Sequence, residues 1–180
     1  MNFIILDLEA TCWRGNAMNR RQEIIELAAI HISGYGEWGS RFQSFVRPID
    51  HPRLSPYCQE LTGIAQEQVD KAKRFDFVIQ SFQDWLETID DPQLLCTWGA
   101  MDTGMIREEC RRHDVDPDFL PSGINLKAQY ARMHELPKEA GLLRALEYHD
   151  IEFEGSPHRA GDDAFNTGKL FIRLLDQWQF

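Results

Sequence analysis

FIILDLEAT, residues 3–11, is an apolar run with β-branched residues that ends in two acids, and it is typical of a buried β-strand. Because side chains alternate along a strand, Asp7 and Glu9 share one face with Phe3 and Ile5. Two carboxylates this close raise each other's energy unless a cation neutralises them. The pair therefore marks either a solvated strand end or a binding site, since ligands in α/β sheets gather beyond the carboxyl ends of strands.

The segments after this strand predict an antiparallel meander. EIIELAAIHIS (Glu23–Ser33) predicts a second strand, although its first half could also be helical. YGEWG at residues 35–39 is a turn sequence, and RFQSFVRP (Arg41–Pro48) alternates like a third strand. Strands joined by loops this short are expected to pair with their neighbours in sequence.

The chain changes character after Pro48. HPRLSPYCQELTG (His51–Gly63) has two prolines and a final glycine, which predicts an irregular loop with a short helix. Helices are then expected at residues 75–89, 102–113, 125–134 and 141–149 and from Ser156–Pro157 to the C-terminus, with one strand at 93–98. This order predicts a mixed-sheet α/β or α+β domain.

The composition is that of one globular domain, expected to span residues 1–180. Hydrophobic residues make up 43% of the chain and charged residues 27%, which excludes disorder and coiled coil as the main state. Asp and Glu number 29 against 19 Lys and Arg, giving a formal net charge of −10. A broad basic surface for nucleic acid is therefore disfavoured, unless bound metal ions supply the positive charge at one spot.

Four cysteines, at positions 12, 58, 96 and 110, are widely spaced and form no C-x-x-C pair. This spacing disfavours a zinc ribbon and a thioredoxin motif, and it predicts reduced thiols. The first residues form no signal-peptide segment, and no stretch reaches the ~18 apolar residues that span a bilayer. We therefore expect a soluble, cytoplasmic protein with no membrane partner.

Asp102 follows the strand predicted at residues 93–98 and opens a helix. An Asp in this place can cap the helix by accepting hydrogen bonds from free N–H groups. The position also lies beyond the carboxyl end of a strand, as Asp7 and Glu9 do. Both roles stay open, and one residue can serve both.

The last helix carries an acid on its apolar face. Helical spacing aligns Asp163 with Leu170, whereas Asp162 aligns with the polar residue Asn166. We therefore expect Asp163 to point at the sheet and Asp162 at water. An inward Asp needs an Arg or Lys partner, hydrogen bonds or a metal ion. His158, at the start of this helix, would reach the same cleft.

Four acids from three separate segments, together with one histidine, form a combination suited to cleaving phosphate esters. Carboxylate sites favour Mg²⁺ or Mn²⁺ over zinc. Two such ions about 4 Å apart can hold the attacking and leaving oxygens of an in-line displacement. A histidine can take the proton from the attacking water. These residues therefore predict phosphodiester hydrolysis with two ions of Mg²⁺ or Mn²⁺ in the site.

Three motifs resemble the exonuclease motifs of the DEDDh superfamily, which includes the polymerase III proofreading subunit, RNase T and oligoribonuclease. They are DLEAT (Asp7–Thr11), TWGAMD ending at Asp102, and HRAGDD (His158–Asp163), in matching order and spacing. The W-G-x-x-D form and HPRLSPYCQELTGIAQEQVDKAKRF are similar to the branch that trims histone-mRNA and small-RNA 3′ ends. The resemblance spans nearly the whole chain.

The resemblance implies an RNase H-like fold, with a central mixed five-stranded sheet whose first three strands are antiparallel, flanked by helices. It implies stepwise 3′→5′ hydrolysis of single-stranded nucleic acid, RNA in the first place, with release of nucleoside 5′-monophosphates. Asp7, Glu9 and Asp163 would bind the first metal ion, Asp7 would bridge to the second, and Asp102 would hold the second. His158 would be the general base.

Contacts with the substrate also follow from the resemblance. Ala10 and Thr11 are expected against the terminal nucleotide, Leu61, Thr62, Gly63 and Ile64 are expected to form part of the pocket for its base, and Trp98 is a candidate for stacking on a base. Phe75 could stack on a base as Trp98 could, but its place on an apolar helix stripe favours the core.

Two alternatives stay open. The chain could act on DNA or on very short oligonucleotides, because sugar discrimination depends on the pocket around the 2′-OH. It could also be a catalytically silent homologue that binds RNA or regulates a partner, although every acid and the histidine are present. The small basic clusters at Lys71–Arg74, Arg111–Arg112 and Arg144 favour solvated helix faces.

Overall fold

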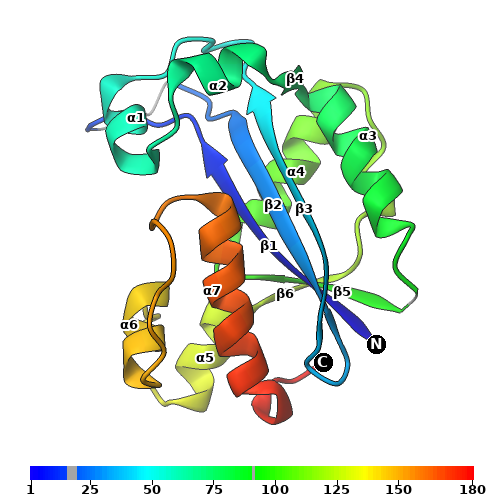
Figure 1. The fold of residues 1–180 in the computed structure, drawn as a ribbon, viewed down its shortest axis with the longest axis vertical. Helices are drawn as coiled ribbons and strands as arrows, with labels where there is room; N and C mark the ends of the chain where they lie inside the picture. The colour runs from blue at the N-terminus through cyan, green and yellow to red at the C-terminus, as the bar shows by residue number, and fades with distance from the viewer. Residues whose placement is uncertain (16–19, 91) are drawn as a thin grey trace.

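A six-stranded mixed sheet forms the centre of the computed structural model, which describes residues 1–15, 20–90 and 92–180 (Figure 1). The strands lie side by side in the order β4-β3-β2-β1-β5-β6. Their bounds are β1 Asn2–Ala10, β2 Ile24–Ser33, β3 Trp38–Arg47, β4 Lys73–Arg74, β5 Gln93–Thr97 and β6 Gly123–Asn125. The first three strands pair antiparallel, which confirms the predicted meander, and β5 lies parallel to β1.

The sheet has one strand more than the five that were predicted. β4 has two residues and pairs parallel with β3, and β6 has three residues and pairs parallel with β5. Strands this short cannot show the alternation on which a prediction depends. β2 is extended from Ile24 onwards, so the helical alternative for its first half is wrong.

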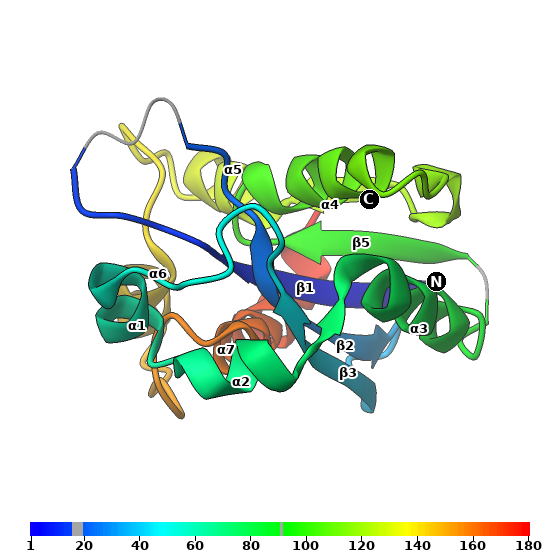
Figure 2. The same cartoon turned by 90° about the horizontal axis from the view of Figure 1, so that it is seen from above.

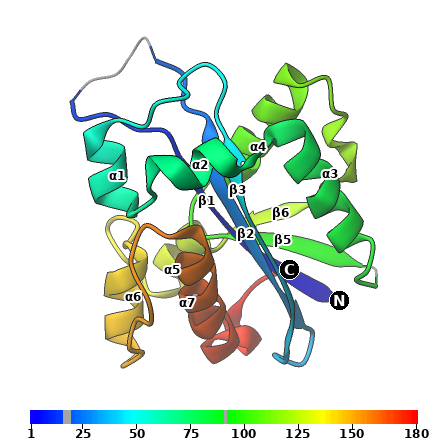
Figure 3. The same cartoon turned by 45° about the horizontal axis from the view of Figure 1, so that its top comes forward.

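Helices cover both faces of the sheet (Figure 3). One layer contains α3 (Phe75–Leu86) and α4 (Met101–Arg112), and the other contains α5 (Leu126–Met133), α6 (Leu142–Tyr148) and α7 (Ala160–Arg173). In β1, Ile4 and Leu6 pack with the α3–α4 layer, whereas Phe3 and Ile5 pack with the α7 layer. The predicted alternation is therefore confirmed, and it places Asp7 on the α7 side.

Two short helices, α1 (Pro56–Thr62) and α2 (Gln66–Lys71), follow β3. The hydroxyl of Ser55 caps α1 by accepting a hydrogen bond from the Cys58 N–H, and Gly63 ends the helix with a φ of 66°. α1 is the short helix expected within residues 51–63, whereas α2 was not predicted. Figure 2 shows that α1 lies at the end of the sheet towards which β1 points.

α7 begins later than the sequence predicted. Ser156–Pro157 do not open the helix, and its N-cap is Arg159. His158 has a φ of 63°, in the left-handed region that an α-helix cannot contain. The helix also ends before the C-terminus, because a 3₁₀ turn at Leu175–Gln177 follows it. Among the described residues, no helix combines the length and apolar character needed to cross a membrane.

Arg112 departs from the solvated helix face expected for it. Its side chain is only 14% exposed and contacts carboxylates of Glu109 at 2.5 Å, Asp50 at 2.7 Å and Glu23 at 3.7 Å. These ion pairs tie α4 to the loop after β3. The neighbouring Arg111 is exposed, as expected.

Candidate active site

The four predicted metal-binding acids converge at one end of the sheet. Asp7 and Glu9 lie at the end of β1, Asp102 in the first turn of α4 and Asp163 in the first turn of α7. β1 and β5 are parallel, so the α4 turn that follows β5 reaches the same edge as the end of β1. Burial raises the pKa of Asp7 well above its usual range, and the charges of Asp102, Asp163 and Glu9 raise it further. The three segments therefore form one acidic cluster.

The other members of the cluster are also hard to ionise. Burial raises the pKa of Glu9 to about 8, with the negative charges of Asp163 and Glu26 adding to the effect and Arg159 opposing it. Burial likewise raises the pKa of Asp102 to about 6 and that of Asp163 to about 6. Asp102 is not a helix cap, because Ala100 occupies that position and no side-chain hydrogen bond closes it.

His158 lies beside two of these acids. Glu9, His158 and Asp163 each offer one ligand atom, and these atoms all lie within 4.8 Å of one another. The side chain of His158 is exposed, and its backbone N–H donates to Asp163 Oδ2 at 2.8 Å. The carboxylate of Asp163 therefore holds the left-handed turn that presents the imidazole to the cluster.

Asp162 is half-buried, so the prediction that it points at water is wrong. Its Oδ2 accepts a hydrogen bond from the Ser156 N–H at 2.8 Å. One turn later, buried Asn166 accepts from the Glu154 N–H at 3.0 Å and donates to the Glu154 carbonyl at 2.8 Å. The chain before α7 folds back over this polar face and covers it.

A fifth acid, Glu26, was not predicted and lies next to the cluster. It is fully buried on β2, directly opposite Glu9 in the strand register. Arg159 donates to both of its oxygens at 3.1 and 3.0 Å, Gln43 donates at 2.8 Å and the Ala160 N–H at 3.1 Å. The Glu in the middle of EIIELAAI was the only available signal, because its partner is 133 residues away.

The donor set of the acidic cluster fits divalent cations. Its four carboxylates form no ion pair with any Lys or Arg within 4.0 Å, as far as the described residues extend. Buried carboxylates are normally paired or coordinate a metal ion. Oxygen donors of this kind suit hard ions such as Mg²⁺ and Mn²⁺.

The residues predicted to contact a nucleotide lie in two places. Ala10 and α1 come together at the end of β1, where Cys58 Sγ lies 3.7 Å from the Ala10 carbonyl. The hydroxyls of Thr11 and Thr62 are both used within the fold, in hydrogen bonds with the Glu23 N–H and the Cys58 carbonyl. Leu61 is half-buried on α1.

The two candidate stacking aromatics differ. Phe75 is 1% exposed within the core, which confirms the favoured interpretation. Trp98 is half-buried, with its ring 5.5 Å from that of Tyr130, and its buried indole N–H has no partner in the part of the chain that the structure describes. Its contact with a base stays a prediction.

Comparisons with known proteins agree with the geometry. A family model described as an exonuclease matches residues 4–171. ERI1 exoribonuclease 2 of Homo sapiens is 35% identical over 194 residues, which cover 96% of this chain and 28% of the relative. 3′-5′ exoribonuclease 1 of Homo sapiens is 31% identical over 179 residues, which cover 95% of this chain and 51% of the relative. The chain therefore spans between about a quarter and a half of these two relatives.

A solved structure also resembles this one closely. The nuclease domain of 3′hExo, described as a DEDDh family member bound to rAMP, superposes with a TM-score of 0.89 at 30% identity. The match covers 97% of this chain and 92% of that structure.

Proposed function

Because the chain belongs to the exonuclease family whose model matches residues 4–171, we propose that it hydrolyses phosphodiester bonds stepwise from the 3′ end of single-stranded RNA. The products would be nucleoside 5′-monophosphates. One observation carries this proposal: Asp7, Glu9, Asp102 and Asp163 converge beside His158, and no Lys or Arg of the described residues forms an ion pair with them. The names of the relatives, which are exoribonucleases, and the rAMP bound to the structural neighbour favour RNA over DNA.

DEDDh exonucleases depend on divalent metal ions. In this chain Asp7, Glu9 and Asp163 would hold one ion, Asp7 would be shared with a second, and Asp102 would hold the second. We infer that the ions are Mg²⁺ or Mn²⁺, because the ligands are carboxylates. When bound, such a pair supplies positive charge to the attacking and leaving oxygens of the displacement.

His158 would take the proton from the attacking water. Its imidazole is exposed at the mouth of the cluster, and the Asp163 carboxylate fixes the turn that carries it. The buried Glu26–Arg159 pair anchors the next residue to β2, so the turn is held from both sides. A positioned base of this kind typically contributes 10²–10⁴-fold to a rate, as an order of magnitude.

The 3′-terminal nucleotide would lie between the end of β1 and α1, against Ala10, Thr11, Leu61 and Thr62. The Cys58–Ala10 contact supports this position, because it places α1 directly beside the acids. Trp98, which follows β5, would border the nucleotide from the Asp102 side.

The test uses 5′-labelled single-stranded RNA and DNA of the same sequence, incubated with Mg²⁺, Mn²⁺ or a chelator. We expect a ladder that shortens from the 3′ end of the RNA in either metal and no products in chelator. Faster degradation of the DNA than of the RNA would identify DNA as the preferred substrate. If wild-type protein degraded neither polymer nor a dinucleotide in either metal, the chain would be a silent homologue.

A further inference from the structure

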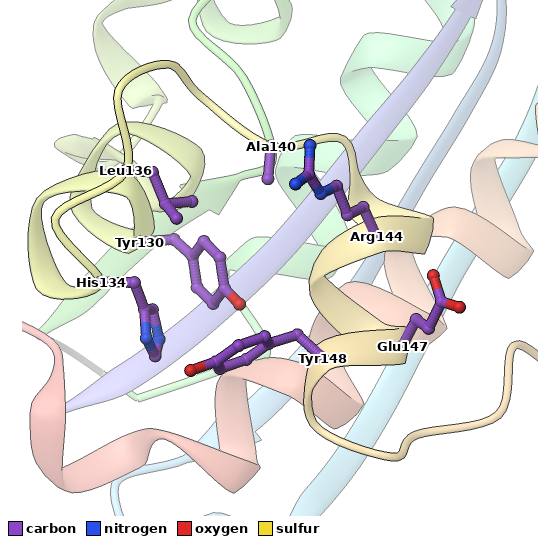
Figure 4. A pocket seen from close by; sticks show the side chains of 7 residues that line it. All are labelled: Tyr130, His134, Leu136, Ala140, Arg144, Glu147 and Tyr148. Atoms are coloured by element: carbon purple, nitrogen blue, oxygen red, sulfur yellow. The ribbon is translucent and has the colours of Figure 1, made fainter.

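A separate pocket lies between α5 and α6 on the α7 side of the sheet (Figure 4). Its volume is about 370 Å³. The residues that line it are Tyr130, His134, Leu136, Ala140, Arg144, Glu147 and Tyr148. None of these is among the residues predicted to hold metal ions, act as base or contact the terminal nucleotide. The pocket is therefore distinct from the acidic cluster.

Aromatic rings from both helices face this space. The ring of His134 lies 4.3 Å from that of buried Tyr130 and 5.3 Å from that of Tyr148. Tyr148 is 71% exposed, so one ring stands at the mouth and another forms the inner wall (Figure 4). A nucleobase can stack on aromatic side chains of this kind whichever base it is, because every base has a π-face.

One residue that lines the pocket, His134, also has a polar side-chain atom without a partner among the described residues. The Nε2 atoms of His134 and His149 are both buried and accept or donate no hydrogen bond in the described part of the chain. The two imidazoles are neighbours, with ring centroids 5.3 Å apart. A buried polar atom without a partner is unusual in a folded protein. A ligand whose ring edge carries donors and acceptors, as a nucleobase does, would satisfy the imidazole nitrogen at the pocket.

The segment that contains the pocket residues is less acidic than the rest of the chain, which favours the binding of a polyanion there. Residues 127–150 contain four basic and four acidic residues, which leaves fifteen basic against twenty-five acidic residues elsewhere. Figure 4 shows the Arg144 guanidinium beside Ala140 at the pocket, whereas the Glu147 carboxylate points away from the three rings. A phosphate next to a bound base would therefore meet Arg144.

The pocket and the acidic cluster are connected along the chain. The segment 149–159 runs from the end of α6 to the turn that carries His158 (Figure 1). α5, α6 and α7 also share one apolar layer on the same face of the sheet. A strand whose 3′ end lies at the acids could thus reach the pocket without crossing to the other face.

We propose that this pocket is a second nucleobase site, which holds an unpaired base of the substrate strand on the 5′ side of the scissile bond. The base stacks on the exposed ring of Tyr148 and meets Tyr130 at the inner wall of the pocket, and Arg144 contacts a neighbouring phosphate. This inference rests on the proposed function, because that function supplies the strand.

The first test compares Tyr148→Ala with Tyr35→Ala, a matched control. Tyr35 is 93% exposed in the turn between β2 and β3, far from the pocket in sequence. For RNA of about twelve nucleotides we expect Tyr148→Ala to lower kcat/KM about tenfold and the control to change it little. Hydrolysis of a dinucleotide, which is too short to fill both sites, should be the same for both variants and wild type.

Equal losses on the dinucleotide and the longer RNA, or no loss on either, would overturn the second site. Arg144→Gln serves as a second variant should Tyr148→Ala unfold, with the same expected dependence on length. If the wild-type protein hydrolysed neither substrate, the proposed function would fail instead. The two failures are therefore distinguishable.

The second test measures contact directly. Single 4-thiouridines are placed in turn along the same RNA, bound in chelator, irradiated and located by mass spectrometry. We expect one internal position to crosslink to residues 130–148 and the 3′-terminal position to crosslink elsewhere. No crosslink to residues 130–148 from any position would overturn the proposal. So would Tyr148-dependent binding of free AMP combined with unchanged hydrolysis of the longer RNA by Tyr148→Ala.

Discussion

Two groups of acidic side chains lie near the same end of the sheet, and only one of them is paired with a Lys or Arg of the described residues. Glu23, Asp50 and Glu109 surround Arg112, and Glu23 also accepts hydrogen bonds from three backbone N–H groups after β3. The acidic cluster at the end of β1 has no such partner among the described residues. Both groups contain buried carboxylates, among them Glu23 and Glu109 in the first and Glu9 in the second, so the missing ion-pair partner is what distinguishes the candidate site.

The same contrast appears between the acidic cluster and the acid beside it on β2. Glu26 lies opposite Glu9 on the neighbouring strand, yet Arg159, Gln43 and a backbone N–H satisfy it. Within residues 1–15, 20–90 and 92–180, Glu9 has no comparable set of donors, and burial raises its pKa to about 8. Two acids in adjacent positions thus have different tasks, one in holding the fold and the other in binding.

The largest effect is expected when the acidic cluster loses one of its carboxylates. Asp163→Asn should abolish turnover, because it removes a carboxylate that the ions require. Asp162→Asn should keep most of it, since the amide oxygen can still accept from the Ser156 N–H. Initial rates on labelled RNA in Mg²⁺ would measure both. The reverse ranking would contradict the assignment of Asp163 to the cluster.

The next effect separates the base from the ligands. His158→Ala should lower kcat by about 10²–10⁴-fold, because the proton of the attacking water loses its acceptor. The carboxylates stay in place, so the affinity for Mn²⁺, measured by calorimetry, should stay within a factor of about two of wild type. A large loss of Mn²⁺ affinity would make His158 a metal ligand instead.

The predictable parts of the site are those with local periodicity. Alternation along β1 put Asp7 and Glu9 on one face, and helical spacing set Asp163 apart from Asp162; both came from residues within a few positions of each other. Partners far along the chain could not be foreseen. Arg112 binds Asp50 across 62 residues and Arg159 binds Glu26 across 133. Hence the sequence alone does not tell a neutralised acid from a free one.

The start of α7 was mispredicted for a related reason. Ser156–Pro157 is a typical helix start, but the two acids that follow accept hydrogen bonds from the Ser156 and His158 N–H groups. These bonds hold residues 156–158 outside the helix. The Ser-Pro signal for a helix start was therefore overridden by hydrogen bonds to the side chains of Asp162 and Asp163.

Replacement of Arg112, the cation among Glu23, Asp50 and Glu109, should lower the stability of the fold and leave the rate of hydrolysis unchanged. Arg112→Met would leave buried Glu109 and Glu23 without their partner, so we expect a loss of about 3 kcal/mol of unfolding free energy. Arg111→Met, its exposed neighbour, should change stability by less than about 0.5 kcal/mol. Urea denaturation measures both, and activity per folded molecule should match wild type. Equal stability of the two variants would contradict the role given to Arg112.

The smallest expected effect is a change of stability with pH and with divalent ions. It tests whether the acidic cluster binds divalent cations from solution. Glu9, with a pKa of about 8, and Asp102 and Asp163, with pKa values of about 6, are all raised above their ordinary range. A raised carboxyl pKa favours the protonated folded state, so this contribution is complete below about pH 4 and is lost as pH rises through 6 and 8. Metal-free protein should therefore lose stability between pH 5 and pH 8 on account of these groups.

Divalent ions should reverse that loss most strongly where the carboxylates are charged. At an ion concentration of about a hundred times Kd, the gain is about 2.7 kcal/mol, and for a chain of this size it raises Tm by roughly 5–10 °C at pH 8. At pH 5 protons compete for the same oxygens, so the rise should be smaller. Differential scanning fluorimetry with Mg²⁺ or Mn²⁺ measures both. The rise should disappear in Asp163→Asn, which removes a ligand of the acidic cluster, and persist in Arg112→Met, which leaves all four acids of that cluster in place. An equal rise at both pH values would place the ions elsewhere on the molecule.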